Sequence, residues 1–331
     1  MKEPLVGPLL RAFFVEHLVR NKNASPQTIA SYRDAFRLLL RFMRDQKGVA
    51  PTSLRVSDLD VSAVLAFLES LEQQRGNTIR SRNVRLAAIR SFFRVVALRE
   101  PTCLQQATQV LAIPVKRFDR RLVGYLTREE IEALISSMDL TQWAGRRDQA
   151  LLLTLYNSGA RVSELIALRK RHICLGASAY LDLTGKGRKQ RSVPLWSRTA
   201  RILRSWMNEL GNDPDIFIFP NARGVPLSRD GVGYVLKQAV QKAAANCPDL
   251  CGKKVTPHTL RHTTAMHLLQ SGVDMGVIAL WLGHESMETT HIYVEADLAM
   301  KEKALEKLGP IGIMKKRFKA DDQLLGFLAA L

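Results

Sequence analysis

The first third of the chain places apolar residues at the three- and four-residue spacing of amphipathic helices. A first helix is indicated by Leu9, Phe13, Phe14 and Leu18. The predicted starts and stops of the next three are Ser25-Pro26 and Gly48, Asp60 and Gly76, and Asn77 and about Ala97, with Pro101 beyond. Four helices in about 100 residues predict a small helical bundle.

The remaining two thirds read as helices that flank one short β region. Thr127-Arg-Glu-Glu130 is a capping box, and an apolar helix is expected from Asp148 to about Ser158, before Gly159. Short strands are predicted at Ala179–Leu183 and Arg191–Pro194, around a glycine-rich turn. Further helices are expected at Thr199 to Leu210, Gly231 to Ala245, Thr259 to Ser271 and Met275 to Leu282. The fold class is therefore mainly α with one small antiparallel sheet.

A linker separates the two patterns. The stretch from about Thr102 to Gly124 holds Pro114 and the basic run Lys116–Arg121, which favours a connection that lets two domains close around a duplex. A length of 331 residues also favours two domains. The predicted boundaries are residues 1–112 for the helical domain, 113–124 for the basic linker, 125–308 for the second domain and 309–331 for a tail.

The charge balance narrows the class of partner. Lys and Arg number 49 against 31 Asp and Glu, a formal net charge of +18, which favours a polyanion over simple solubilising charge. The chain has no apolar run of the roughly 20 residues that a spanning helix needs and no secretory signal pattern at its start. Four scattered cysteines (Cys103, Cys174, Cys247 and Cys251) are typical of reduced thiols. Double-stranded DNA as partner and a cytoplasmic location are the expectations.

The fourth predicted helix is rich in arginine. Between Asn77 and Leu98 it carries no Asp or Glu that could pair with these side chains. A helix of this kind is suited to a DNA groove, and the alternative is a solvated basic face. The arginines that we expect to contact DNA are Arg80, Arg82, Arg85 and Arg90, and Arg94 lies on the same helix.

Candidate chemistry comes from six residues spread along the second domain. They are Arg161, Lys186, His258, Arg261, His284 and Tyr293. Two arginines, a lysine and two histidines can neutralise a phosphate and move its protons, and a tyrosine can attack it and hold it covalently. Each residue alone has an ordinary structural explanation, whereas their order and shared chemistry predict phosphodiester cleavage without a metal or other cofactor.

The first two of these residues lie in turns. Arg161 follows Gly159-Ala160, and Glu164 three residues later is a supporting carboxylate that could orient its guanidinium. Lys186 lies between two glycines at the hairpin tip, where a flexible lysine could enter a groove and donate a proton. Lys189 and Arg191 continue the basic tip, and we expect both to bind DNA.

His258 and Arg261 are three residues apart at a helix start marked by Thr256-Pro257, so both side chains share one face near donor amides and a positive dipole. A zinc site of His258 and His262 is the rival reading. Thr259 stands where a zinc protease of that spacing would have Glu, which argues against it.

Together these motifs resemble the tyrosine recombinase (phage integrase) family. The family pattern is an Arg in R-x-x-E-L, a hairpin lysine, H-x-x-R, L-G-H and a tyrosine nine residues after that histidine, and the chain supplies each of them. The resemblance covers the second domain almost throughout and the helical first third more loosely. It implies a core-binding, SAM-like four-helix domain followed by a catalytic domain of the DNA breaking-rejoining fold.

The resemblance also implies a mechanism. Tyr293 would attack a DNA phosphate to form a 3′-phosphotyrosyl bond and release a 5′-hydroxyl. Arg161 and Arg261 would hold the non-bridging oxygens, Lys186 would be the general acid, His258 would accept or shuttle the tyrosine proton and His284 would hydrogen-bond the phosphate. A 5′-hydroxyl from a second DNA would then complete strand exchange through a Holliday junction.

Several functions remain open within this chemistry. The run Ile278–Ser286 followed by Ala296–Lys303 resembles integrases of transposon-like elements. The alternatives are an Xer-type chromosome-dimer resolvase, a DNA-relaxing enzyme of the type IB topoisomerase sort and a non-catalytic DNA-binding regulator. Ala299–Lys307 reads as an amphipathic helix, and an apolar stretch ends the chain. In this family such tails dock on a neighbouring protomer in a tetramer, and packing against the chain's own domain is the alternative.

Overall fold

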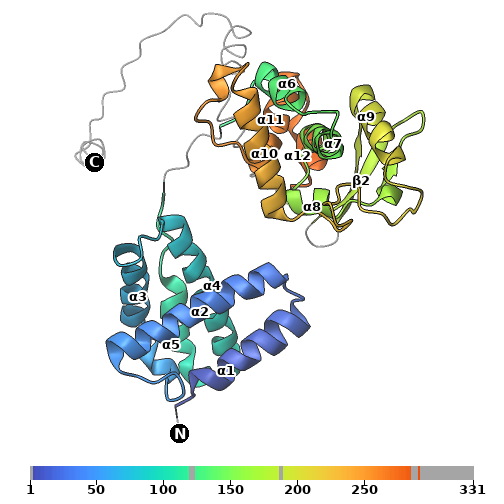
Figure 1. Ribbon diagram of the computed structural model, residues 1–331. Coiled ribbons are helices and arrows are strands. Elements are labelled where there is room, and N and C mark those ends of the chain that lie inside the picture. The colour runs from blue at the N-terminus through green and yellow to red at the C-terminus, as the bar shows by residue number, and fades with distance from the viewer. Residues whose placement is uncertain (1–2, 119–123, 186–188, 285–289, 291–331) are drawn as a thin grey trace, which may run out of the picture. The chain divides into compact units, whose positions relative to one another are not determined.

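The computed structural model describes residues 3–118, 124–185, 189–284 and 290. By its internal contacts the chain divides into two compact units, Met1–Arg120 and Arg121–Leu331 (Figure 1). The division falls inside the predicted basic linker. Within the residues described, no helix is long and apolar enough to cross a membrane.

Among its described residues, the elements of the first unit are all helices or helical turns (Figure 1). Its elements are α1 (Val6–Ala12), a π-helical stretch (Phe13–Asn21), α2 (Pro26–Lys47), a 3₁₀ turn (Val56–Asp58), α3 (Val61–Gln73), α4 (Ile79–Arg99), a 3₁₀ turn (Pro101–Cys103) and α5 (Leu104–Ala112). Phe13, Phe36 and Phe92 meet at its centre, with ring centroids 5.3 to 6.0 Å apart, so α2, α4 and the π-helical stretch share one aromatic core.

Polar caps set the helix ends in this unit as the sequence predicts. The Ser25 hydroxyl accepts from the Thr28 amide at 3.2 Å, and the Asp60 carboxylate accepts from the Ala63 amide at 2.7 Å. Gly48 ends α2. The start of α4 was predicted one residue early, because the capping side chain is Thr78, which accepts from the Ser81 amide, and not Asn77.

The stretch from about Thr102, which the sequence pattern suggested as linker, starts with a helix that lies before the predicted boundary at residue 113. Residues 104–112 form α5, whose Ala107 and Val110 are buried against the bundle, so this stretch belongs to the first unit. Lys116 is also held there, since its ammonium pairs with Glu72 at 2.9 Å and its amide donates to Asn83 at 3.2 Å. The capping signals at Thr102–Ala112 are weak, which explains why the sequence pattern did not reveal this helix.

The second unit combines helices with a small sheet. Its elements are α6 (Arg128–Ser136), α7 (Trp143–Ser158), α8 (Val162–Ile166), a 3₁₀ turn (Lys170–His172), β1 (Ile173–Cys174), β2 (Tyr180–Thr184), β3 (Gln190–Pro194), α9 (Ser197–Asn208), α10 (Arg229–Ala243), a 3₁₀ turn (Pro248–Leu250), α11 (Pro257–Gln270) and α12 (Met275–Leu282). The Thr127 capping box starts α6 as predicted.

The sheet is antiparallel in the order β1-β2-β3. Leu181 faces Val193 across β2 and β3, and Leu183 faces Arg191, so the apolar side of the hairpin joins the core. The strand β1 was not predicted. The predicted α7 was too short at its start, because Trp143 and Arg147 extend the helix by more than a turn before Asp148.

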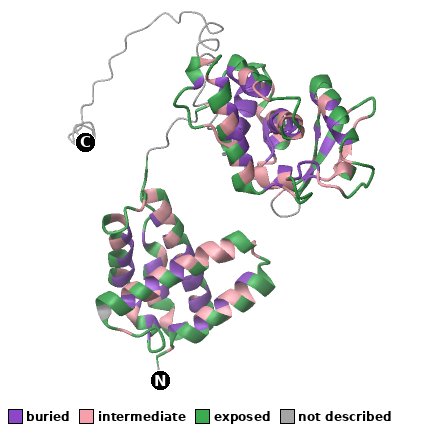
Figure 2. Ribbon diagram, in the orientation of Figure 1, coloured by how far each residue is buried: buried purple, intermediate pink, exposed green. Residues whose placement is uncertain are grey.

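Helix α7 is the centre of this unit. Figure 2 shows it largely buried, and it packs against α9 on one side and α11 on the other. Residues 151–155 of α7 are buried all around the helix, as expected for a core helix. Because α7 is fixed in this way, its carboxyl end presents the following turn, residues 159–161, at a defined place.

Candidate active site

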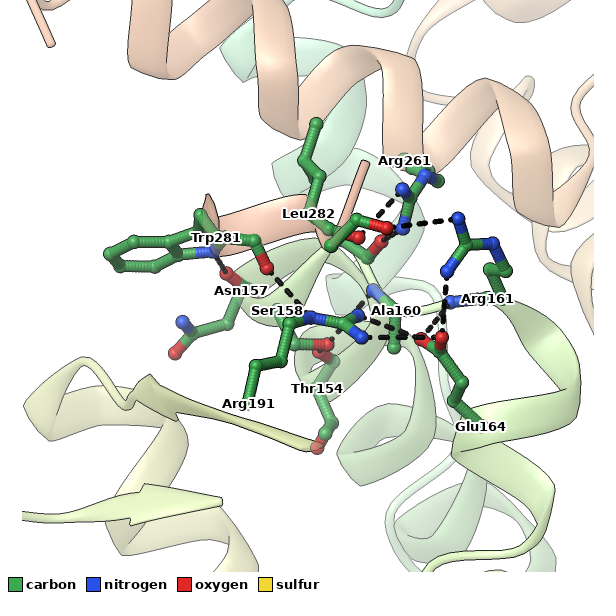
Figure 3. A network of polar contacts seen from close by, with 12 residues as sticks. Thr154, Asn157, Ser158, Ala160, Arg161, Glu164, Arg191, Arg261, Trp281 and Leu282 are labelled. Atoms are coloured by element: carbon green, nitrogen blue, oxygen red, sulfur yellow. Dashed lines mark hydrogen bonds and ion pairs between the residues drawn. The ribbon is translucent and has the colours of Figure 1, made fainter. Parts of the chain in front are cut away.

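Arg261 ties the end of α7 to the end of α12 (Figure 3). Its guanidinium donates to the Gly159 carbonyl at 2.6 Å and to the Leu282 carbonyl at 2.7 Å, and the residue is only 5% exposed. Gly159 adopts φ +56°, and a Cβ there would lie 2.4 Å from the Leu282 side chain. A glycine is therefore required both by the backbone conformation and by the closeness of these two helix ends.

Arg161 is the N-cap residue of α8, in the turn that follows α7. Its Nη1 donates to the Glu164 carboxylate at 2.9 Å and its Nη2 donates to the Gly283 carbonyl at 3.1 Å. The Arg161 amide donates to the same carboxylate. This arrangement fixes the guanidinium plane while 31% of the side chain stays exposed to solvent. The predicted pairing of Arg161 with Glu164 is present.

Glu164 also accepts from a second arginine. Both η nitrogens of Arg191 donate to its carboxylate, at 3.2 and 2.7 Å, and Arg191 Nε donates to the Trp281 carbonyl at 2.9 Å. Burial by itself would raise the pKa of Glu164, but the hydrogen bonds and charge of Arg191, followed by Arg161, lower it below its ordinary value. Glu164 is thus an ionised carboxylate shared by two guanidiniums.

The start of α11 places His258 beside these arginines. Thr256 caps the helix and Pro257 occupies its first turn, as the sequence predicts. Partial burial, followed by the charges of Arg261 and Arg161, lowers the pKa of His258. A neutral imidazole at pH 7 can accept a proton, which is the role expected of this residue.

His284 follows Gly283, the left-handed residue that ends α12. Its Nδ1 lies 2.8 Å from the hydroxyl of Thr290, which is fully buried. Burial, followed by the charges of Arg261 and Arg161, lowers the pKa of His284 to about 4. At neutral pH His284 is uncharged, and its hydrogen bond to Thr290 restrains the ring. The sequence analysis did not single out Thr290, although it lies in the same short segment as Tyr293.

A cavity of about 220 Å³ lies at this meeting point. It is lined by Arg161, Gly185, Lys189, Gln190, Arg191, Ala279, Leu280, Gly283 and His284. A larger cavity of about 450 Å³, bordered by Tyr156 and His267 among others, shares none of these residues. We assign the chemistry to the smaller one, because the charged groups that can stabilise an oxyanion converge there.

The structure therefore brings together Arg161, His258, Arg261 and His284, which come from three separate stretches of sequence. Lys186 and Tyr293 lie outside the described residues, as do Ala299–Lys307 and the tail 309–331. Gly185 and Lys189, on either side of Lys186, both line the small cavity.

The predicted DNA-contacting arginines of α4 differ in their surroundings. Arg80 and Arg94 are exposed, whereas Arg82 is 4% exposed and its Nε lies 3.1 Å from the Glu72 carboxylate on α3. Arg85 donates to the Ser31 carbonyl at 3.2 Å. Arg82 thus has an acidic partner on a neighbouring helix, whereas the sequence argument considered only Asp and Glu within its own helix. Its guanidinium is not presented to solvent.

Arg191 is likewise turned inward. Its side chain is 11% exposed and its guanidinium is engaged by Glu164 and the Trp281 carbonyl, whereas its hairpin neighbour Lys189 is exposed. Among the described residues there is no group of three or more His, Cys, Asp or Glu side chains that could hold a metal ion.

Two family models match the chain. The model described as "Phage integrase family" matches residues 124–300, and the model described as "Phage integrase, N-terminal SAM-like domain" matches residues 12–100. The matches correspond to the two structural units.

Curated relatives agree with both matches. A Sinorhizobium fredii (strain NBRC 101917 / NGR234) protein named "Putative integrase/recombinase y4rC" is 48% identical over 330 residues, which cover 100% of this chain and 99% of that protein. The Pelobacter propionicus protein "Tyrosine recombinase XerC" is 35% identical over 311 residues, which cover 93% and 97%.

Solved structures share the fold. XerH recombinase bound to palindromic difH substrate, a post-cleavage complex, aligns with a TM-score of 0.67 at 21% identity over 86% of this chain and 80% of that one. The Tn1549 transposon integrase in complex with a circular intermediate DNA aligns with a TM-score of 0.66 at 16% identity over 92% and 100%.

Proposed function

The chain belongs to the phage integrase family of tyrosine recombinases, and from this premise we propose that it integrates or transposes a mobile DNA element. As a tyrosine recombinase it is an enzyme that cuts and rejoins DNA. The observation that carries the proposed chemistry is the convergence of Arg161 and Arg261 on the backbone of Leu282 and Gly283, directly before His284. Two fixed guanidiniums beside a neutral imidazole suit one phosphodiester.

In the proposed reaction the Tyr293 oxygen attacks the scissile phosphorus and forms the 3′-phosphotyrosyl bond. His258, uncharged at neutral pH because its pKa is lowered, takes up the phenol proton. As the bond from phosphorus to the 5′-oxygen breaks, Lys186 gives a proton to that oxygen and a 5′-hydroxyl leaves. Arg161 and Arg261 stabilise the charge on the non-bridging oxygens, and His284 donates to one of them. A 5′-hydroxyl attack in reverse rejoins the strand, so the exchange needs no added energy source.

The mobile-element role is supported by the similarity to the Sinorhizobium fredii integrase/recombinase along the whole chain. The second candidate is resolution of chromosome dimers, which the relatives named XerC favour. Sequencing the junctions of trapped covalent adducts would separate the two. Junctions at the ends of a mobile element support the first proposal, and junctions at one chromosomal site support the second.

We further propose a tetramer on two DNA duplexes, assembled through the C-terminal tail, and a cytoplasmic location. Within it, Arg80, Arg85, Arg90 and Lys189 contact DNA. Exposure of Arg80 and Lys189 supports this role for those two.

The experiment that tests the proposed chemistry is Tyr293→Phe, assayed on a nicked suicide duplex in buffer with EDTA. We expect the wild-type protein to form a covalent protein–DNA adduct under these conditions. The variant should bind the same duplex with unchanged affinity and form no adduct, since only the attacking oxygen has been removed.

The matched control is Tyr234→Phe, which removes the hydroxyl of an exposed tyrosine on α10 and should leave the adduct yield unchanged. An adduct that persists in Tyr293→Phe would refute the nucleophile assignment. Strict dependence of wild-type cleavage on a divalent metal would refute the metal-free mechanism.

A further inference from the structure

The side chain of Arg191 joins three separate parts of the active site (Figure 3). It belongs to β3, it donates to Glu164 on α8, and it donates to the Trp281 carbonyl near the end of α12. Glu164 lies 27 residues before Arg191 in the chain, and Trp281 lies 90 residues after it. A single guanidinium thereby connects the hairpin to the two segments that hold Arg161 and His284.

The surroundings of Arg191 leave little freedom to its guanidinium. The side chain is 11% exposed and Glu164 is 3% exposed, so the bond between them is largely shielded from water. Gly283 packs directly on the group, because a Cβ at this position would lie 2.9 Å from Arg191 Nη1. The glycine before His284 is thus required by its left-handed backbone and also by the space that Arg191 occupies.

Glu164 transmits the position of Arg191 to Arg161. The Glu164 Oε1 accepts from Arg161 Nη1 and from Arg191 Nη1, while Oε2 accepts from the Arg161 amide and from Arg191 Nη2. Without Arg191, one carboxylate would lose two donors at its buried side, and it could turn away from the orientation that aims Arg161.

We propose that Arg191 is a positioning residue for cleavage: it acts through Glu164 on Arg161 and through the Trp281 carbonyl on the segment that carries His284, and it does not bind DNA. This inference rests on the proposed role of Arg161 as a phosphate ligand. It replaces the expectation, drawn from the basic hairpin sequence, that Arg191 contacts the duplex.

The test measures cleavage and binding separately for Arg191→Met and Arg191→Lys on the suicide duplex. A displaced phosphate ligand typically slows a reaction by about 10²-fold, so we expect about that loss for Arg191→Met. Arg191→Lys should lose about tenfold, because an ammonium cannot make the paired bonds to Glu164 and reach Trp281 as well. DNA affinity and its salt dependence should not change.

A second substrate identifies the route through Arg161. In this duplex a methyl group replaces one non-bridging oxygen of the scissile phosphate, which removes the charge that Arg161 stabilises. The wild-type to Arg161→Ala rate ratio should then shrink, and the wild-type to Arg191→Met ratio should shrink with it, since both variants lose the same interaction. Arg191→Lys, which keeps the positive charge and the aliphatic stem, provides the same comparison if Arg191→Met does not fold.

The control is Arg198→Met, which removes a surface arginine that pairs with Glu132. This variant should leave the cleavage rates on both duplexes unchanged. A weaker affinity and a salt slope lower by about 1 for Arg191→Met would show a DNA contact and overturn the inference. The inference is also overturned if the methyl-substituted phosphate shrinks the rate ratio for Arg161→Ala but not the ratio for Arg191→Met. If neither rate ratio shrinks on that duplex, both the inference and the proposed role of Arg161 are overturned.

Discussion

The arginines of α4 and those of the active site are arranged in opposite ways. Along α4 the arginines are close in sequence and diverge in space: Arg80 points to solvent, Arg82 is buried against Glu72 and Arg85 bonds the Ser31 carbonyl. In the second unit, Arg161 and Arg191 are 30 residues apart in the sequence and share the carboxylate of Glu164. Nearness in sequence therefore did not give the α4 arginines common surroundings, and distance in sequence did not prevent Arg161 and Arg191 from sharing a partner.

The difference follows from the elements that carry the side chains. A helix turns each successive residue by about 100°, so closely spaced arginines on α4 must face different surroundings. The active site is built instead from element ends, namely the turn after α7, the hairpin and the end of α12, which tertiary packing brings together. Substitutions in the two sets should accordingly affect different properties.

The largest effect is expected from Arg261→Lys. The shorter, single-point donor cannot bond the Gly159 and Leu282 carbonyls and also stabilise a phosphate, so cleavage should slow by about 10³-fold with DNA affinity retained. Single-turnover cleavage on the suicide duplex measures this loss.

Its matched control is Arg147→Lys. Arg147 is an equally buried arginine of the same unit that donates to the Pro220 carbonyl and pairs with Asp148. This substitution should lower stability and leave the cleavage rate of the folded protein unchanged. Equal cleavage losses in both variants would mean that Arg261 matters only for folding.

An intermediate effect is expected from Arg82→Met. Glu72 would keep Lys116 but lose its buried partner, and the free energy of unfolding should fall by about 2 kcal/mol in urea titrations. The comparison is Arg80→Ala, which should change stability by less than about 0.5 kcal/mol and lower the slope of log affinity against log salt by about 1. Should Arg82→Met lower that slope instead, Arg82 would be a DNA contact after all.

The smallest effect concerns pH. Burial lowers the pKa of His262 and of His284 to about 4 in each case, whereas an unfolded chain protonates histidine near its ordinary pKa of about 6.5. Between these values the unfolded state binds more protons, so stability is present above pH 6.5 and decreases as the pH falls toward 4. The loss should be on the order of 1 kcal/mol per histidine, after allowance for solvent screening.

Urea unfolding at pH 7 and at pH 5 measures this loss. The variant His262→Gln, which cannot take up a proton, should show a smaller difference between the two pH values. An unchanged difference would mean that His262 titrates alike in the folded and unfolded chains.

Much of the fold was predictable because its signals are local. Ser25 and Asp60 cap their helices, Gly159 ends α7, and β2 and β3 pair as antiparallel strands. The helix α5, which was not predicted, has no side-chain cap. The first residues of α7, 143–148, are mostly polar or small, so they show no apolar residues at helical spacing. These elements are held mainly by packing against α4 and α9, which a local pattern does not record.

The candidate site was predictable by residue type and less so by contact. The spacing of Arg161 and Glu164 indicated their pairing, and Thr256-Pro257 indicated the helix start beside His258. No local signal placed Glu164 between two arginines or joined His284 to Thr290, because both contacts depend on how distant segments fold together. The catalytic roles of all six residues stay predictions, and Lys186 and Tyr293 also lie outside the described residues.

The charges around the shared carboxylate do not cancel. Arg161, Arg191 and Arg261 with the ionised Glu164 leave a net charge of +2, and the lowered pKa of His284 adds none at neutral pH. A phosphodiester carries one negative charge, and attack by a phenolate raises the total on the five-coordinate phosphorus to two. The cluster is therefore cationic even before Lys186 and the proton taken up by His258 are counted, and its field stabilises the negative charge that develops in the transition state more than the single charge of the bound ground state.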